Sequence, residues 1–209
     1  MLPPGQSRRR LNRAMNVKLD QIATVRTLTT FRDRTPVENV DGNAHLLSIR
    51  DVVTRWPPDL SSIPRVVVDE HQLSAALEEG DILLPGRGAS YPARLFHGAP
   101  RPVCTAGQVY VIRAKREIDP AYLCWYLNRP VIQAEINQLL AGSSIKALNK
   151  SSLLTIEISL PPEPERLRIA ELRSLSEQRT RLRDELERLD QAEIEHACET
   201  LFEHRRAHG

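Results

Sequence analysis

The sequence predicts an α+β domain with a mixed β-sheet, followed by a long C-terminal coiled-coil helix. The first 160 residues combine short β-like apolar runs with helical patterns and are punctuated by Pro and Gly, whereas residues 165–205 contain neither. Three prolines separate the two parts: Pro161, Pro162 and Pro164. At 209 residues and 23.7 kDa the chain has the size of one domain with an appendage, and its 41% hydrophobic content is ordinary for a soluble globular protein.

Short β-strands are expected where Val-, Ile- and Leu-rich runs lie between turn residues. The predicted strands are 46–53, 65–68, 82–84, 109–113 and 154–160. The acidic run 78–81 is interpreted as a helix end and a turn that lead into the third of these strands.

Three helices are expected within the domain. The first, 17–25, has an apolar face formed by Leu19, Ile22 and Ala23. The second ends at residue 127 and begins with the favourable N-cap Asp119 and with Pro120. The third, 131–141, stops at Gly142. Its apolar face consists of Ile132, Ile136, Leu139 and Leu140.

The C-terminal segment carries a narrow apolar stripe on an otherwise charged helix. Leucines recur at spacings of three and four residues, Arg179 interrupts them, and the stripe continues after a one-residue slip at Ile194. The leucines before the slip are Leu172, Leu175, Leu182, Leu186 and Leu189. A helix of this length spans on the order of 60 Å, more than the domain can cover. We therefore favour a homodimer that pairs through these leucines over a hairpin folded back on the same chain.

Charge is distributed unevenly although the net charge is only +2. Residues 1–16 hold four Arg and no acidic residue, which predicts a disordered basic arm. Residues 82–116 hold six basic side chains and no carboxylate. When exposed, such a stretch is typical of a surface that binds a phosphate backbone. The alternative is an Arg-rich surface without a partner, because Arg outnumbers Lys 25 to 4.

Cysteine usage and motif content argue against a catalytic or metal centre. Cys104, Cys124 and Cys198 form no CxxC pair, which predicts free thiols in a reducing cytoplasm. No apolar run has the length of a membrane span, and the start does not resemble a secretory signal. Catalytic sequence motifs are absent, so we expect a non-catalytic binding protein without a cofactor of its own. A hydrolase that uses His97, Cys104 or an acidic residue is the weaker alternative.

The order of several motifs resembles that of type I restriction–modification specificity subunits. The run GDILL at 80–84 is similar to a strand of that family, and YLCWYL follows at 122–127. The end of a helix at 140–145 (LAGSSI) and the run ALNKSSL at 147–153 come next, before a strand, two prolines and the long helix. KLDQIA at 18–23 is similar to the usual start of the family.

This resemblance implies a DNA target-recognition domain over 17–160 and a dimerisation and spacer helix over 161–209. A complete subunit of the family has two of each, so the chain resembles a half-length form, of which two copies would pair head to tail. The implied partners are double-stranded DNA, a methyltransferase subunit that carries S-adenosylmethionine, and a nuclease subunit where restriction occurs. The pair Glu165-Arg166 departs from the family, which usually has Glu-Gln after the prolines.

Candidate DNA contacts lie in two loops, one after Leu84 and one after Gly142. Arg and Lys would hold phosphates there, and Arg is the residue that most often reads guanine in the major groove. The candidates are Arg87, Ser90, Tyr91, Arg94, Arg101, Ser143, Ser144, Lys146 and Lys150. Each of them could instead be a solvated surface residue. The alternative function is a coiled-coil protein-interaction adaptor without DNA specificity, which a shallow salt dependence of DNA binding would favour.

Overall fold

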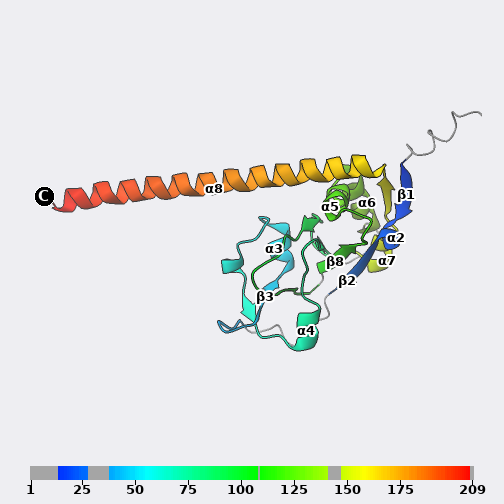
Figure 1. The fold of residues 1–209 in the computed structure, drawn as a ribbon. Helices are drawn as coiled ribbons and strands as arrows, with labels where there is room; N and C mark the ends of the chain where they lie inside the picture. The colour runs from blue at the N-terminus through cyan, green and yellow to red at the C-terminus, as the bar shows by residue number, and fades with distance from the viewer. Residues whose placement is uncertain (1–13, 28–37, 108, 141–146, 208–209) are drawn as a thin grey trace, which may run out of the picture. The chain divides into compact units, whose positions relative to one another are not determined.

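The computed structural model describes residues 14–27, 38–107, 109–140 and 147–207. The chain divides into two compact units, residues 1–170 and residues 171–209. The first unit contains all the strands and short helices of the described chain, and the second consists of the continuation of one long helix (Figure 1). None of the helices described is long and apolar enough to cross a membrane.

A four-stranded antiparallel sheet organises the first unit, with strand order β2-β8-β5-β6. Its strands are β2 (Ala23–Thr27), β5 (Ile82–Pro85), β6 (Arg94–Leu95) and β8 (Val109–Ala114). The strands predicted at 82–84 and 109–113 are therefore confirmed, each extended by one residue. In contrast, β6 was not predicted from the sequence, because two residues are too few to show an alternation of apolar and polar side chains.

Both faces of this sheet are buried, so it separates two hydrophobic clusters. Ile82, Leu84 and Ile112 face the first cluster, whereas Leu83 and Val111 face the second. This alternation follows from the two-residue period of a β-strand. A continuous apolar run such as 82–84 is what a strand covered on both faces requires.

Helices cover the first face of the sheet (Figure 1). They are α2 (Leu19–Ile22), α5 (Pro120–Leu127), α6 (Pro130–Leu140) and α7 (Lys150–Leu154). As predicted, Asp119 caps α5, since its Oδ1 accepts hydrogen bonds from the backbone N–H groups of Ala121 (2.8 Å) and Tyr122 (3.1 Å). Helix α6 is also confirmed, but Leu139 is 41% exposed and does not belong to its buried face. Gly142, the expected stop, lies outside the described residues.

A three-stranded sheet with order β4-β3-β7 and several short helices lie on the second face. The strands are β3 (Ala44–Leu47), β4 (Arg65–Val66) and β7 (Val103–Thr105), and β3 pairs antiparallel with β4 but parallel with β7. The helices are α3 (Ile49–Val53), the 3₁₀ turn η1 (Leu60–Ser62) and α4 (Glu70–Ser74). The strand predicted at 65–68 is thus confirmed only for its first two residues.

The strand predicted at 46–53 is wrong beyond Leu47, where the chain turns into α3. Ser48 precedes this helix, and both its backbone N–H and its Oγ donate to Oδ2 of Asp51, each at 2.7 Å. These bonds satisfy polar groups at the start of a helix. They therefore outweigh the β-propensity of the Ile and Val residues that follow.

The N-terminal helix predicted at 17–25 is also wrong, apart from the four residues of α2. Residues before it form β1 (Met15–Lys18), and those after it form β2. Each strand finds a partner far along the chain: β1 pairs with β9 (Glu157–Leu160), and β2 pairs with β8. Met15 and Asn16, assigned from the sequence to the basic arm, thus belong to a strand. The predicted apolar face is nevertheless confirmed, since Leu19, Ile22 and Ala23 are buried.

The long C-terminal helix, predicted over 165–205, is confirmed as α8 (Glu163–Ala207). Its first turns belong to the first unit, because Ala170 is 5% exposed and packs in the first hydrophobic cluster together with Ile169. The strand predicted before it, 154–160, is shorter than expected. Asn149 caps α7 by accepting from the Ser151 N–H (2.9 Å), and Leu154 ends that helix, so β9 begins only at Glu157.

Candidate nucleic-acid interface

The loop between β5 and β6 presents two of the predicted DNA contacts to solvent. Arg87 and Ser90 are both exposed, whereas the strand before them is completely buried. Gly88 has φ +123°, a backbone conformation that glycine adopts without the strain a side chain would bring. The chain bends at Gly88, directly after Arg87.

Tyr91, expected to be a contact, is a core residue. It is 1% exposed, and its hydroxyl donates to the carbonyl of Gly88 at 3.1 Å. Its own carbonyl accepts a hydrogen bond from Nε2 of Gln133 on α6 at 2.9 Å. Burial raises the pKa of the Tyr91 phenol, which keeps it a neutral donor. Tyr91 thus anchors the loop to the helical layer instead of facing a ligand.

The two loops expected to bind DNA meet in the structure. Arg87 and Ala147 form an isolated antiparallel bridge, and the N–H of Leu148 donates to the carbonyl of Gly86 at 2.7 Å. The Tyr110 hydroxyl donates to the Leu148 carbonyl at 2.6 Å and so ties the same segment to β8. Lys150, the first residue of α7, is exposed nearby along the chain. The other candidates of this loop, Ser143, Ser144 and Lys146, lie outside the described residues.

Arg94 connects β6 to the chain that follows α3. Its Nε donates to the carbonyl of Val52 and its Nη2 to that of Thr54, both at 3.1 Å. A guanidinium with two backbone acceptors holds a fixed position, so Arg94 has a structural role here.

The contact made by Arg94 places two further arginines, Arg50 and Arg55, beside β6. Both are exposed. Trp56 reinforces this arrangement, because its Nε1 donates to the carbonyl of Leu95 at 3.0 Å. Neither Arg50 nor Arg55 was predicted as a candidate contact, and Arg50 was assigned to the strand predicted at 46–53. The capping residues of α3 are the signal that would have identified the helix.

Arg101 is exposed, but it belongs to another part of the first unit. The next residue, Pro102, accepts a hydrogen bond from the N–H of His45 at 2.9 Å, which places this part of the chain beside β3. Arg101 therefore lies at the end of the three-stranded sheet, whereas Arg87 lies beside α7. The predicted contacts form a group around Arg87 and a separate position at Arg101.

Arg113, one of the six basic residues in the carboxylate-free stretch, forms an ion pair with a buried carboxylate. Its Nε and Nη2 donate to the two carboxylate oxygens of Asp81 at 2.7 and 2.9 Å, and its Nη1 contacts Glu78 at 2.7 Å. The hydrogen bond to Asp81 raises the pKa of Arg113 above its ordinary value, against the opposing effect of burial.

Asp81 itself is 1% exposed and lies directly before β5. It also accepts from the N–H of Glu78 at 2.9 Å and faces Nη2 of Arg26 at 3.5 Å. Residues 78–81 are thus a turn, and not the helix end expected from the sequence, because α4 already ends at Ser74. The signal that could have indicated this ion pair is Asp81, the acidic residue directly before the carboxylate-free stretch.

The geometry does not support a thiol nucleophile at Cys104. Its side chain is 2% exposed, and its Sγ lies 3.8 Å from the carbonyl of Gln72. Burial raises the pKa of the Cys104 thiol, although Arg26 acts in the opposite direction. The neutral thiol is a poor nucleophile. Among the residues that the structure describes, no group of three His, Cys, Asp or Glu side chains could hold a metal ion.

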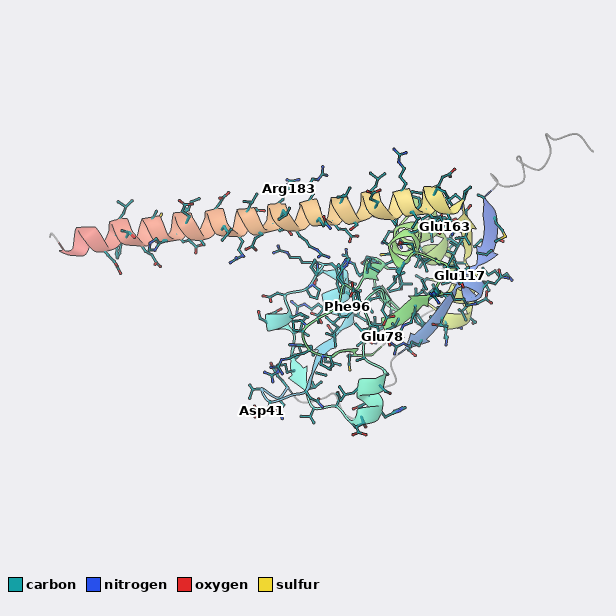
Figure 2. The ribbon with its side chains drawn as sticks, viewed as in Figure 1. Asp41, Glu78, Phe96, Glu117, Glu163 and Arg183 are labelled. Carbon is teal, nitrogen blue, oxygen red and sulfur yellow. The ribbon has the colours of Figure 1, made fainter. Side chains whose placement is uncertain are left out.

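The second unit exposes the apolar stripe predicted for pairing. Its five leucines retain between 50% and 66% of their surface: Leu172, Leu175, Leu182, Leu186 and Leu189. Charged side chains surround them along α8, on which Figure 2 marks Arg183. Some of these charges pair along the helix, as in the contact of Arg188 with Glu185 at 2.6 Å. Such exposed pairs contribute little to stability, and the leucines remain the distinctive feature.

Comparison with known families decides the assignment. Residues 15–188 match the family described as type I restriction modification DNA specificity domain. The chain belongs to this family. This membership agrees with the resemblance noted from the motifs. No curated protein sequence matches the chain significantly.

Solved structures of type I systems share the fold of this family member. The HsdS subunit from Thermoanaerobacter tengcongensis matches with a TM-score of 0.55 and 20% identity over 86% of this chain and 39% of that one. A structure reported for complex assembly and conformational transition of the type I R-M system matches with a TM-score of 0.58 and 20% identity over 92% and 45%. The S subunit from M. genitalium matches with a TM-score of 0.55 and 13% identity over 80% and 40%. The chain thus spans less than half the length of each structure.

Proposed function

We propose that this chain recognises a specific sequence in double-stranded DNA as half of a dimeric type I specificity subunit. The single observation that carries the proposal is the family match over residues 15–188. Two copies would join through α8, and each would present one recognition unit to one half of a divided DNA site. The chain itself performs no chemistry in this proposal. It positions a methyltransferase subunit and, where restriction occurs, a nuclease subunit.

The surface proposed for DNA is the group around Arg87. It comprises the β5–β6 loop with Arg87 and Ser90, Ala147, which forms a bridge with Arg87, and the start of α7 with Lys150. The bridge between Arg87 and Ala147 supports this grouping, because it joins loops that are about sixty residues apart in the sequence. Positive side chains on adjoining loops suit a phosphate backbone, and an Arg among them suits a guanine edge.

Arg101 is proposed as a second, separate phosphate contact at the end of the three-stranded sheet. Arg94 and Tyr91 take a different role in the proposal. They hold this part of the chain in place, Arg94 through the carbonyls of Val52 and Thr54 at the end of α3 and Tyr91 through the carbonyl of Gly88.

The test is the salt dependence of duplex binding by the Arg87→Ala variant. Loss of one phosphate contact reduces the slope of log affinity against log salt by about 0.9. The matched control is Arg116→Ala, which removes another exposed arginine of the same basic stretch. Pro85, at the end of β5 just before Arg87, pairs with Val109 at the start of β8. Residue 116 follows the other end of β8, which is Ala114. We expect a reduced slope for Arg87→Ala only.

Two results would contradict the proposal. An equal change of the salt slope in both variants would show that binding depends only on overall charge. An unchanged slope in both variants would show that the group around Arg87 does not contact DNA. A shallow salt slope for the unaltered chain would favour the protein-interaction adaptor. Light scattering measures the other part of the proposal, for which the expected mass is near twice 23.7 kDa.

A further inference from the structure

The start of α8 follows β9 almost directly. Only Pro161 and Pro162 lie between the two elements, and proline restricts the backbone because its ring fixes φ and removes the N–H. The carbonyl of Pro162 accepts from the N–H groups of Glu165 (3.0 Å) and Arg166 (3.2 Å), so the helix begins as soon as these prolines end. We call residues 161–170, which all belong to the first unit, the root of α8.

Arg166 joins the first turn of α8 to two carbonyl groups. Its Nη1 donates to the carbonyl of Pro161 at 2.8 Å, directly after β9, and its Nη2 donates to that of Glu117 at 3.4 Å. Glu117 belongs to the turn between β8 and α5, 49 residues earlier in the sequence. A guanidinium carries several N–H donors in one rigid plane. This half-buried side chain thus connects the helix to the end of a strand and to a distant turn.

The segments that carry the two acceptors are themselves held in place. In the β8–α5 turn, the N–H of Lys115 donates to the carbonyl of Ile22 at 2.8 Å. At the end of β9, the carbonyl of Ser159 accepts from the hydroxyl of Tyr122 on α5 at 2.5 Å. Strand β9 also pairs with β1 over all four of its residues. The guanidinium therefore donates to carbonyls that have fixed positions in the first unit.

Position 166 is also where the sequence departs from the pattern of its family, which usually has Gln there. A Gln side chain is shorter than Arg and ends in a single amide nitrogen, so it cannot donate with two separate nitrogens as Arg166 does. The packing of Ala170 and of the partly buried Ile169 in the first hydrophobic cluster does not depend on this difference. The two hydrogen bonds at the root are therefore a feature that this chain owes to Arg166.

A small change of angle at the root would have a large effect at the far end of α8. The helix is continuous over 45 residues, from Glu163 to Ala207, which corresponds to about 67 Å. A tilt of about 3° at one end moves the other end by about 3.5 Å, close to the rise of one base pair in B-DNA. In a dimer that joins through α8, the distance between two DNA half-sites is consequently sensitive to how firmly the root is held.

We propose that Arg166 is a positioning residue, which restricts the divided DNA site to one spacer length by holding the root of α8. This inference rests on the dimer of the proposed function and adds a residue that acts through α8 and not through a contact with DNA. Without the two hydrogen bonds, the root adopts several orientations, and the dimer accepts several spacers. If three orientations were equally populated, the apparent affinity for the original spacer would fall about threefold.

The test is selection of random duplexes by the full-length Arg166→Gln chain, followed by sequencing of the bound fraction. The matched control is Arg168→Gln, which removes an exposed arginine of the same helix and hence the same charge. We expect the unaltered chain and the control to enrich one motif with a single spacer length. Arg166→Gln should enrich the same motif with several spacer lengths and bind the original spacer about threefold more weakly.

Folding of each variant is checked by urea unfolding with tryptophan fluorescence, since Trp56 and Trp125 both lie in the first unit. A cooperative transition shows that a changed spacer does not come from an unfolded domain. Arg166→Lys is the second variant, in case Arg166→Gln does not fold. Its ammonium group keeps the charge but not the planar pair of donors, so we expect it to broaden the spacer as well.

Three results would overturn the inference while the proposed DNA recognition stands. The first is a single, unchanged spacer in both Arg166 variants. The second is an equal broadening in Arg168→Gln, because loss of charge alone would then be the cause. The third is a different enriched motif in Arg166→Gln, which would make Arg166 a direct DNA contact. If the unaltered chain enriches no motif, the proposed function fails and this inference fails with it.

Discussion

Replacing Asp81 by Asn is expected to destabilise the first unit strongly, although the change is isosteric. Asp81 is 1% exposed and accepts hydrogen bonds from two nitrogens of Arg113 and from the N–H of Glu78. Arg26 adds a second positive charge at 3.5 Å. The Asn side chain would keep one acceptor oxygen but direct an amide N–H₂ at a guanidinium. Both arginines would lose Asp81 as a counter-ion, while Arg113 would keep its contact with Glu78.

The magnitude follows from the burial of the two partners. Removing one member of a fully buried ion pair costs about 3–5 kcal/mol. The side chain of Arg113 remains 36% exposed, so water still solvates part of its charge. We therefore expect a loss of stability at the lower end of this range, about 3 kcal/mol. With a urea dependence near 2 kcal/mol per molar, the unfolding midpoint should fall by about 1.5 M.

The assay is urea unfolding at fixed protein concentration, followed by tryptophan fluorescence. Both tryptophans, Trp56 and Trp125, lie in the first unit, so their signal reports its unfolding and not that of the helix beyond it. The matched control is Glu79→Gln, which removes an exposed acidic charge two residues away and should change stability by less than about 0.5 kcal/mol. A loss below about 1 kcal/mol for Asp81→Asn would refute the reasoning that this ion pair stabilises the sheet.

Three further predictions concern other parts of the first unit. Gly42→Ala should lower stability by about 2 kcal/mol in the same urea assay, because the new Cβ would lie 2.5 Å from a backbone nitrogen of β4; an unchanged midpoint would contradict this close approach. At pH 8 a thiol reagent should label only Cys198 in the folded protein, since Cys104 and Cys124 are buried and burial raises the pKa of Cys104, which keeps it protonated; rapid labelling of all three would argue against the fold. Arg94→Ala should cost about 2 kcal/mol through its two lost hydrogen bonds, and a DNA-binding defect at full stability would instead identify Arg94 as a direct contact.

Elements with a strong local signal could be predicted from the sequence. The cap at Asp119 with Pro120 located the start of α5, and a charged segment without Gly or Pro located α8. Strands β5 and β8 were recognisable because both are short apolar runs between turn residues. In each case the information lies within about ten residues of the element.

Elements that depend on distant partners could not be predicted in this way. The split of 17–25 into strand, helix and strand arises because β9 and β8 pair with its two ends. Residues 46–53 carried a helix signal at Ser48 and Asp51, but the apolar residues within the strand and within the helix form one continuous β-like run that concealed it.

The candidate site could likewise be predicted only in part from the sequence. Composition located the basic stretch, and Arg87 and Ser90 are exposed within it. The sequence could not separate them from Tyr91 and Arg94, because Tyr91 is buried by packing against the first hydrophobic cluster and Arg94 is held by carbonyls about forty residues away. Exposure in such a loop is a property of the folded chain and not of its composition.

In the proposed function, two copies of this chain together recognise a divided DNA sequence. Selection from a pool of random duplexes by the purified full-length chain, followed by sequencing of the bound fraction, measures this recognition. Because identical subunits in a two-fold pair present identical surfaces, the account predicts one motif repeated in inverted orientation on both sides of an unspecified spacer. A bound fraction without an enriched motif, or with a single unrepeated motif, would contradict it.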